Sequence, residues 1–176
     1  DNTFLILGTE HGKSWGGRQG TKNGYCISYD EAARIPLIMR HPTMLPAGRV
    51  WNSGVSLVDI APTILEAANI KPFPTHGRSL LGGLRAGQDE WTRPIVIENV
   101  SGLAIKGSLY KERAIRTRRW KMILRKFDVG KERADELYDM DADPGEVRNL
   151  FDSPGSQPVI RELAAALRKW AQETAD

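Results

Sequence analysis

The segment Phe4–Gly17, FLILGTEHGKSWGG, joins an apolar run to a glycine-rich turn that carries ionisable side chains. Its Gly-Lys-Ser ending is similar to a phosphate-binding loop, but Gly8 and Gly12 enclose three residues where that loop has four. The residues after Ser14 are Trp-Gly-Gly-Arg-Gln-Gly, which do not form the helix whose N-terminus would bind a phosphate. The segment therefore argues against a nucleotide site, and ATP binding would be needed to revive that interpretation.

Glu10 and His11 are the residues of this segment with the clearest chemistry. They follow closely on the apolar run Phe4–Leu7, and ligands of open α/β sheets bind beyond the carboxyl ends of the strands. A carboxylate beside an imidazole at such a place can supply two ligands of a metal ion, or act as an acid–base pair. The structural alternative, a solvated carboxylate and a hydrogen-bonded histidine, stays open on position alone.

The elements that must position this pair are predicted from hydrophobic patterns. Three apolar runs are typical of strands buried on both faces of a parallel sheet, namely Phe4–Leu7, Pro36–Arg40 and Ile95–Ile97. Strands of this kind need neighbours and covering helices, of which the chain supplies few. We therefore expect the C-terminal part of a larger α/β protein, with a small complete α+β domain as the alternative.

Helix signals separate these strands. Four helical segments are predicted: Tyr29–Arg34, a helix capped by Asp59, Ser79–Leu84 and Gln157–Thr174. The second of them has the apolar stripe Ile60, Ile64, Leu65 and Ala68. After Trp91 the pattern changes to short segments separated by turns, which predict a small antiparallel sheet from 95–98, 112–117, 120–125 and 134–139. The sequence Asp143-Pro144-Gly145 predicts a chain reversal.

Composition limits the function without defining it. The 176 residues carry a net charge of +3 and are 40% hydrophobic, with no apolar run near the length of a membrane span. The single cysteine, Cys26, excludes an internal disulfide and a cysteine-based zinc site. The basic stretch Lys111–Lys126 is interpreted as the solvated face of two strands rather than as a nucleic-acid site, although it could also bind an anionic substrate. His41 and His76 lie beside prolines in connections and are assigned no role.

Five blocks of the chain, in order, resemble the type I sulfatases of the alkaline phosphatase superfamily. DNTFLILGTEHG resembles D-N-T-x-x-[IVL]-x-x-[ST]-D-[HN]-G, and YDEAARIPLIMRHP resembles Y-[ED]-E-x-x-R-[IV]-P-L-I-x-R-x-P. The third block, LVDIAPTILEAANI, resembles L-V-D-[IL]-x-P-T-[IL]-L-x-x-A-G-I, and the fourth is His76–Gly87. The fifth block resembles the C-terminal subdomain of the family and consists of RAIRTRRWKMIL and ELYDMDADPGEVRNL. Together these blocks cover nearly the whole chain.

The resemblance implies an α/β fold: the C-terminal part of an alkaline-phosphatase-like mixed sheet flanked by helices, followed by a small antiparallel sheet packed with a C-terminal helix. Residues 1–90 would be the incomplete C-terminal part of the catalytic domain, and residues 91–176 the small α+β subdomain. In the family, the Asp-[HN] pair supplies two ligands to a divalent cation, usually calcium. Those positions fall on Glu10 and His11, which implies Ca²⁺ or Mg²⁺ as cofactor. Glu10 departs from the family Asp by one methylene.

The resemblance also implies a lysine that neutralises a sulfate oxygen, four residues before the tyrosine of Y-[ED]-E. Here that position is Tyr25, and the candidate lysine is Lys22, seven residues before Tyr29. Family members attack sulfur with a formylglycine made in the pattern C/S-x-P-x-R, which is absent from this sequence. Cys26 lacks these surroundings, so we expect the nucleophile upstream of Asp1.

The predicted function is therefore that of a fragment of a sulfuric ester hydrolase, inactive alone, acting on a sulfated small molecule or sulfated glycan. A phosphonate monoester hydrolase or phosphodiesterase of the same superfamily is one alternative. A non-catalytic anion-binding module is another, because of the basic stretch. The resemblance suggests a periplasmic or secreted setting, and no nucleic-acid partner or membrane span is expected.

Overall fold

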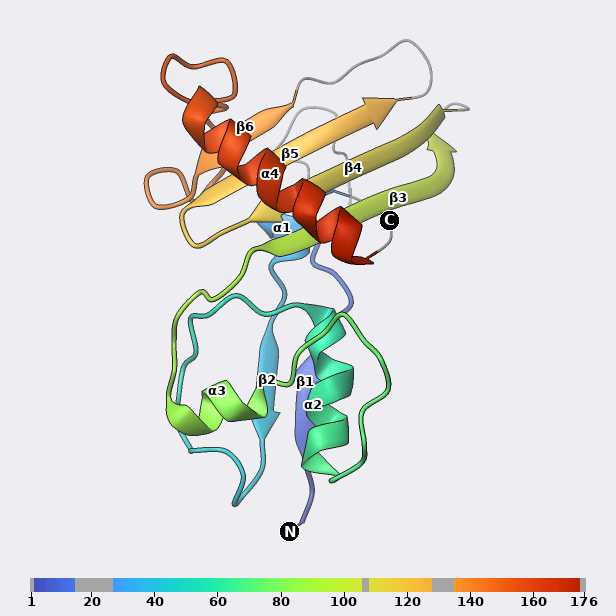
Figure 1. The fold of residues 1–176 in the computed structure, drawn as a ribbon, viewed down its shortest axis with the longest axis vertical. Helices are drawn as coiled ribbons and strands as arrows, with labels where there is room; N and C mark the ends of the chain where they lie inside the picture. Colours follow the sequence, from blue (N-terminus) through green and yellow to red (C-terminus); the bar gives the residue numbers. More distant parts are fainter. Residues whose placement is uncertain (1, 15–26, 106–107, 128–134, 175–176) are drawn as a thin grey trace. The chain divides into compact units, whose positions relative to one another are not determined.

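The computed structural model describes residues 2–14, 27–105, 108–127 and 135–174, which fold into two compact units. The first unit consists of Asp1–Glu10 and Ile35–Arg93, and the second of His11–Arg34 and Pro94–Asp176. Figure 1 shows their elements along the chain. The predicted domain boundary after residue 90 stays a prediction, because a division into compact units does not show which segment belongs to the catalytic domain and which to the subdomain.

In the first unit, strands β1 (Leu5–Gly8) and β2 (Leu37–Arg40) form an antiparallel pair that aligns Leu7 with Ile38. The expectation of parallel strands buried on both faces was wrong for this pair. Leu7 and Ile38 are 58% and 56% exposed. An apolar run reports which faces of a strand are hydrophobic, but the direction of a strand is decided by the path of its connection.

Two helices complete the first unit, α2 (Ile60–Ala67) after a 3-10 turn at Leu57–Asp59, and α3 (Leu81–Ala86). The predicted stripe of α2 was wrong for Ile64 and Ala68, which are exposed, whereas Ile60 and Leu65 are partly buried. The buried residues of the helix are Pro62 and Thr63. The hydroxyl of Thr63 donates to the carbonyl of Asp59 and accepts the N–H of Leu80. These bonds turn the Asp59–Thr63 side of the helix toward residues 78–81.

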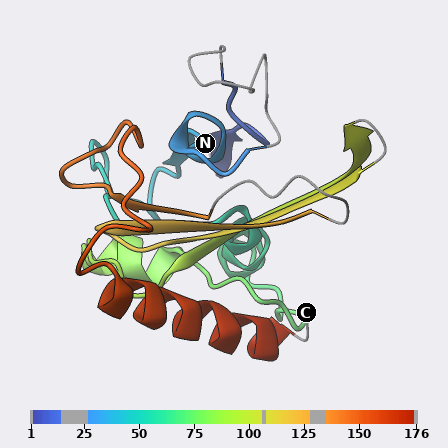
Figure 2. The same cartoon turned by 90° about the horizontal axis from the view of Figure 1, so that it is seen from above.

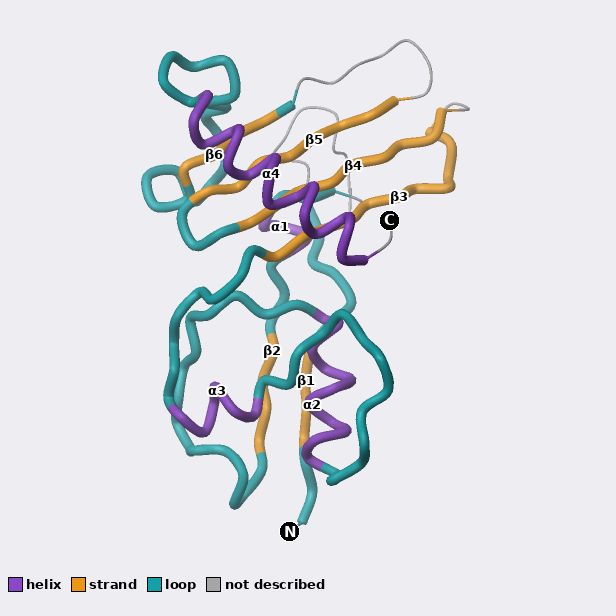
Figure 3. The backbone as a smooth tube through the Cα atoms, in the orientation of Figure 1, coloured by secondary structure: helices purple, strands orange, loops and turns teal. Residues whose placement is uncertain are grey.

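The second unit contains a four-stranded antiparallel sheet in the order β3-β4-β5-β6. Its strands are β3 (Ile95–Ile105), β4 (Ser108–Arg116), β5 (Trp120–Phe127) and β6 (Glu136–Asp139). The predicted small antiparallel sheet is confirmed, and Ile95–Ile97 belongs to it. Figure 3 shows these strands side by side.

Helix α4 (Gln157–Thr174) covers one face of this sheet, as Figure 2 shows with the sheet seen edge-on. Its bounds agree with the prediction. Leu163 and Leu167 of α4 pack against a core contributed by all three of the strands β4, β5 and β6, namely Ile115, Met122 and Leu137. The burial of this apolar face stabilises the helix on the sheet.

The opposite face of the sheet packs against the segment 27–33, which includes the single-turn helix α1 (Asp30–Ala33). This second core consists of Ile27, Tyr29, Ala32, Ala114, Ile123, Tyr138 and Met140. Side chains of a strand alternate between the two faces, so Met122 faces α4 while its neighbour Ile123 faces the α1 segment. The α1 segment is therefore part of this unit, although it is distant in sequence.

Candidate functional site

The predicted metal-binding pair follows β1. Glu10 is the second residue after the strand, and both Glu10 and His11 have exposed side chains. Glu10 is the last residue of the first compact unit, and His11 is the first residue of the second. The structure thus places both residues at the surface, directly beyond the carboxyl end of β1. Their role as metal ligands stays a prediction.

The ring of His11 has a defined hydrogen bond. Its Nδ1 lies 2.7 Å from the carbonyl oxygen of Gly12. A carbonyl oxygen only accepts, so this bond requires the proton on Nδ1 and leaves Nε2 as the unprotonated nitrogen of the neutral ring. Histidines that bind metal commonly show this arrangement, with one ring nitrogen donating to a carbonyl and the other binding the ion.

Gly12 connects His11 to α1. Its N–H donates to the carbonyl of Ala32 at 2.7 Å. A Cβ at position 12 would overlap the carbonyl oxygen of Glu31, so a side chain there would force the two segments apart. The glycine is therefore required by the close approach of two backbones.

The other predicted catalytic residue, Lys22, lies outside the described residues, as does Cys26. Among the residues that the structure describes, no three His, Cys, Asp or Glu side chains gather in a way that could hold a metal ion.

Beneath α1, an ion-pair cluster that the sequence did not predict joins the α1 segment to the sheet. Lys121 of β5 is completely buried, and its Nζ lies 2.7 Å from Asp30 Oδ1 and 2.7 Å from Glu146 Oε1. The second oxygen of Glu146 accepts the N–H of Asp30 at 2.8 Å. The first residue of α1 is therefore bound through both its side chain and its backbone.

A second group of buried charges lies beside the first. Arg125 of β5 donates from Nε to Glu112 at 2.7 Å, pairs with Glu136 at 2.6 Å, and reaches the hydroxyl of Tyr29 at 3.0 Å. The other oxygen of Glu112 accepts the N–H of Ser28 at 2.6 Å. Residues 28–30 are thus bound to Glu112 of β4 and to Arg125 and Lys121 of β5. We call Lys121, Arg125 and their partners Asp30, Glu112, Glu136 and Glu146 the buried charge cluster.

The interpretation of Lys111–Lys126 as a solvated face was wrong for the basic residues Lys121 and Arg125. Arg118 is well exposed, but Lys121 and Arg125 point to the face of the sheet that packs against α1. The signal that could have revealed this is the alternation in β5, where Lys121, Ile123 and Arg125 share one face. A charged residue on a core face requires a buried partner.

The environment shifts the pKa values of this cluster. Burial by itself would raise the pKa of Glu136, but hydrogen bonds from Arg125 and Tyr29 outweigh it, and the pKa is lowered from its ordinary value of 4.5. Burial raises the pKa of Glu146, although the charge of Lys121 acts against it. Burial and the neighbouring Glu136 raise the pKa of Tyr138 and of Tyr29, so both phenols are protonated near neutral pH and donate to Glu136.

These shifts predict an acid-dependent loss of stability that depends on Glu136. A carboxyl whose pKa is lowered by folding stabilises the native state above its unfolded pKa and loses this contribution as the pH falls through the folded pKa. The stability difference between wild type and Glu136→Gln should therefore be constant from about pH 7 to 5 and shrink below about pH 4.5. Thermal unfolding of both proteins across this range measures it.

The comparison with Glu136→Gln is needed because Glu146 acts in the opposite direction. Its raised pKa gives a contribution that is present at low pH and is lost as the pH rises through the folded value. Since both proteins retain Glu146, its effect cancels in the difference. A difference that does not change with pH would show that Glu136 is not stabilised as a carboxylate.

Asp59 and His41 of the first unit form hydrogen bonds that stabilise the local backbone. Asp59 is buried and accepts N–H bonds from Ser56 and Arg78, both at 2.9 Å, and it pairs with Arg93. Asp59 is the N-cap residue of α2, as predicted, but its side chain makes no cap bond to α2 and instead completes the capping box that Ser56 begins in the preceding 3-10 turn. Buried His41 accepts the N–H of Met44 at Nδ1, consistent with the absence of an assigned role.

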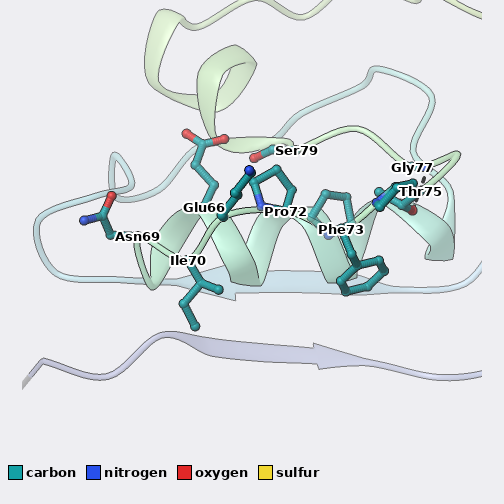
Figure 4. A pocket seen from close by; sticks show the side chains of 11 residues that line it. Glu66, Asn69, Ile70, Pro72, Phe73, Thr75, Gly77 and Ser79 are labelled. Carbon is teal, nitrogen blue, oxygen red and sulfur yellow. Dashed lines mark hydrogen bonds between the residues drawn. The ribbon is translucent and has the colours of Figure 1, made fainter.

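A hollow of about 780 Å³ lies on the first unit, between α2 and residues 69–79. Figure 4 shows Glu66 projecting from α2, with Ile70 and Phe73 on the connection that follows. Glu66 forms an exposed ion pair with Arg85. Neither Glu10 nor His11 lines this hollow, so it does not contribute to the predicted site.

Known sulfatases are similar to this chain over most or all of its length. Residues 25–173 match the family model of the N-sulphoglucosamine sulphohydrolase C-terminal region. An N-acetylglucosamine-6-O-sulfatase of Bacteroides thetaiotaomicron is 29% identical over 184 residues, covering 100% of this chain and 31% of that protein. An extracellular sulfatase SULF-1 homolog of Drosophila melanogaster is 34% identical over 105 residues, covering 56% of this chain and 9% of that protein.

Solved structures agree. A protein in complex with its substrate D-glucosamine-2-N,6-O-disulfate superposes with a TM-score of 0.78 at 27% identity, covering 98% of this chain and 34% of that one. The chain therefore spans about a third or less of the length of these three proteins. None of the described helices is long and apolar enough to cross a membrane.

Proposed function

Because the chain belongs to the family of N-sulphoglucosamine sulphohydrolase C-terminal regions, we propose that it is the C-terminal part of a sulfatase that hydrolyses sulfate esters of a sulfated glycan. The observation that carries the proposal is the family match over residues 25–173. The substrate class is supported by the relative named for N-acetylglucosamine-6-O-sulfate and by the structural neighbour bound to a disulfated glucosamine.

In this proposal Glu10 and His11 supply two ligands of a divalent cation. The donor chemistry fits: Glu10 offers an exposed carboxylate, and the Nδ1 bond of His11 leaves Nε2 as the nitrogen able to bind an ion. Glu10 is longer than the family Asp, and Ca²⁺ accepts variable carboxylate geometry better than Mg²⁺ does, so Ca²⁺ fits best. When bound, such a cation would polarise the oxygens of the sulfate group.

The chain's own residues would bind and orient rather than attack. His11 would keep its ring orientation through the Gly12 carbonyl. Lys22 would neutralise a sulfate oxygen, as its sequence position suggests. The formylglycine nucleophile would come from a part of the protein outside this sequence, so residues 1–176 alone would not turn over substrate.

The two alternatives receive less support. An anion-binding module would use the basic stretch, but Lys121 and Arg125 are buried against carboxylates and cannot contact an external polymer. A phosphonate monoester hydrolase or phosphodiesterase is disfavoured because the relatives described above are sulfatases. The relative named as extracellular supports a periplasmic or secreted setting for this protein.

The proposal is tested by comparing residues 1–176 with the complete polypeptide encoded by the reading frame that contains them. We expect the complete polypeptide to release sulfate from glucosamine 6-sulfate, and the 176-residue chain to release none. Release of sulfate by the 176-residue chain would show that its own residues include a nucleophile. Hydrolysis of a phosphodiester in place of the sulfate ester would support the phosphoesterase instead.

His11 is tested in the same complete polypeptide. The variant His11→Ala should lower kcat/KM by at least about 100-fold, because changes to residues that only support metal ligands already cost 10–100-fold. The matched control is His76→Ala, which removes an exposed histidine from a connection of the first unit and should leave kcat/KM unchanged. Equal activity of the two variants would exclude His11 from the site.

A further inference from the structure

We infer that Lys121, with its partners Asp30 and Glu146, positions His11 by holding α1 against the C-terminal sheet. This inference rests on the proposed function, because it assigns His11 to the metal site. It gives the small antiparallel sheet a role in catalysis, in addition to folding. All of the contacts that carry the inference lie within the second compact unit.

The first step is the attachment of α1 to β5. Lys121 has no exposed surface, and its ammonium group lies 2.7 Å from a carboxylate oxygen of each partner. Glu146, 1% exposed, also accepts the N–H of Asp30. Asp30 is the first residue of α1, so the position of this helix is set by a side-chain bond and a backbone bond at the same residue.

The second step is the transmission of this position along α1. The helix is one turn long, and the N–H groups of Ala32 and Ala33 both donate to the carbonyl of Tyr29 at 2.9 Å. Tyr29 is itself bound to Glu136 and Arg125. A single turn with its N-terminal end bound in this way moves as one body, so a displacement of Asp30 displaces the carbonyl of Ala32.

The third step connects α1 to the imidazole. The carbonyl of Ala32 accepts the N–H of Gly12, and the carbonyl of Gly12 lies 2.7 Å from Nδ1 of His11. The hydrogen-bonded path from Lys121 to the ring therefore runs through Asp30, α1 and Gly12. A shift of α1 would change the orientation of the ring, its tautomer, or both.

The construction of the cluster supports a role beyond stability. Buried ion pairs contribute little net stability, since the desolvation of each charge offsets their attraction. Glu146 also has a φ of +54°, in the left-handed region that disfavours residues with a side chain. In this conformation Glu146 lies at 2.7 Å from Lys121 and accepts the N–H of Asp30. A costly arrangement that fixes one short helix is expected where position matters.

The experiment uses the complete polypeptide encoded by the reading frame that contains residues 1–176, with ¹⁵N-labelled histidine at about pH 8, where an ordinary imidazole is neutral. The ring signals of His11, His41 and His76 are assigned by single substitutions. We expect His11 to show the Nδ1–H tautomer in the wild type. It should shift toward Nε2–H in Gly12→Ala, where the added Cβ overlaps Glu31, and in Lys121→Met, which acts from the far end of the path.

Matched controls separate positioning from general perturbation. Gly82→Ala adds a Cβ to open space in α3, and Arg118→Gln removes an exposed basic side chain paired with Asp141. Both should keep the wild-type His11 tautomer. If Lys121→Met does not fold, Asp30→Asn replaces it, since Lys121 then retains Glu146. Asp30→Glu, which keeps the carboxylate, should restore the wild-type signal.

Titration with Mn²⁺ tests whether His11 binds a metal ion and whether the positioning variants weaken that binding. In the wild type, low concentrations should broaden the His11 ring signals before those of exposed His76. The positioning variants should require about tenfold more Mn²⁺, the usual cost of losing support behind a ligand. An unchanged tautomer and unchanged Mn²⁺ response in both Gly12→Ala and Lys121→Met would overturn the inference. A tautomer that shifts as expected, with no preferential broadening of His11 in the wild type, would instead overturn the proposed metal site.

Discussion

Replacing Lys121 by Met is expected to lower the free energy of unfolding of the second unit by about 3–5 kcal/mol, the usual cost of removing one partner of a buried ion pair. Lys121 is fully buried between Asp30 and Glu146, which lie on two separate segments of the chain. The substitution keeps the length of the side chain but leaves Glu146 in the interior without its cation. The penalty for an uncompensated buried charge causes the loss.

Hydrogen exchange of amides in β5 and α4, as a function of denaturant, measures this change in the second unit. The double variant Lys121→Met/Glu146→Gln should recover part of the stability, because replacing both members of a buried pair by neutral groups is often close to neutral. Arg118→Gln, which removes an exposed pair with Asp141, should cost about 1 kcal/mol or less. If Lys121→Met costs no more than Arg118→Gln, Lys121 does not compensate a buried charge.

Replacing Asp59 by Ala is expected to destabilise the first unit by a similar amount, about 3–5 kcal/mol. The buried carboxylate accepts the N–H groups of Ser56 and Arg78 and pairs with the partly buried guanidinium of Arg93. Alanine removes all of these bonds at once. The 3-10 turn that precedes α2 then loses its capping box, and two backbone donors lose their acceptor.

Exchange of the α2 amides measures the loss. Asp59→Asn retains an acceptor oxygen and should lose less than alanine does, which separates the hydrogen bonds from the charge. Glu66→Gln, on the same helix, removes an exposed pair with Arg85 and should cost about 1 kcal/mol or less. Equal exchange in Asp59→Ala and Glu66→Gln would contradict a structural role for Asp59.

The order of the elements and the C-terminal half of the fold were predictable because their signals are local. The period of the apolar residues in Gln157–Thr174 defines α4, and the short strands separated by turns define the small sheet. The pair Glu10 and His11 was predicted as a candidate because its position after a strand is visible in the chain. The family was predicted from five ordered blocks, and the match over residues 25–173 confirms it.

Other features depended on contacts between distant residues. The direction of β2 relative to β1, and the face of α2 that is buried, are set by the paths of connections and by bonds from Asp59 and Thr63. The spacing of apolar residues predicts neither the strand direction nor the buried face of α2.

The burial of Lys121 and Arg125 was likewise decided by tertiary structure. In the sequence they are two of many basic residues, and only their pairing with Glu146 and Glu112 permits them to lie in a core. The sequence by itself predicted a candidate ion-binding pair, and it determined most of the segments that form helices and strands. Only the folded chain decided which charges meet, because a charge is buried where a partner from another segment compensates its lost hydration.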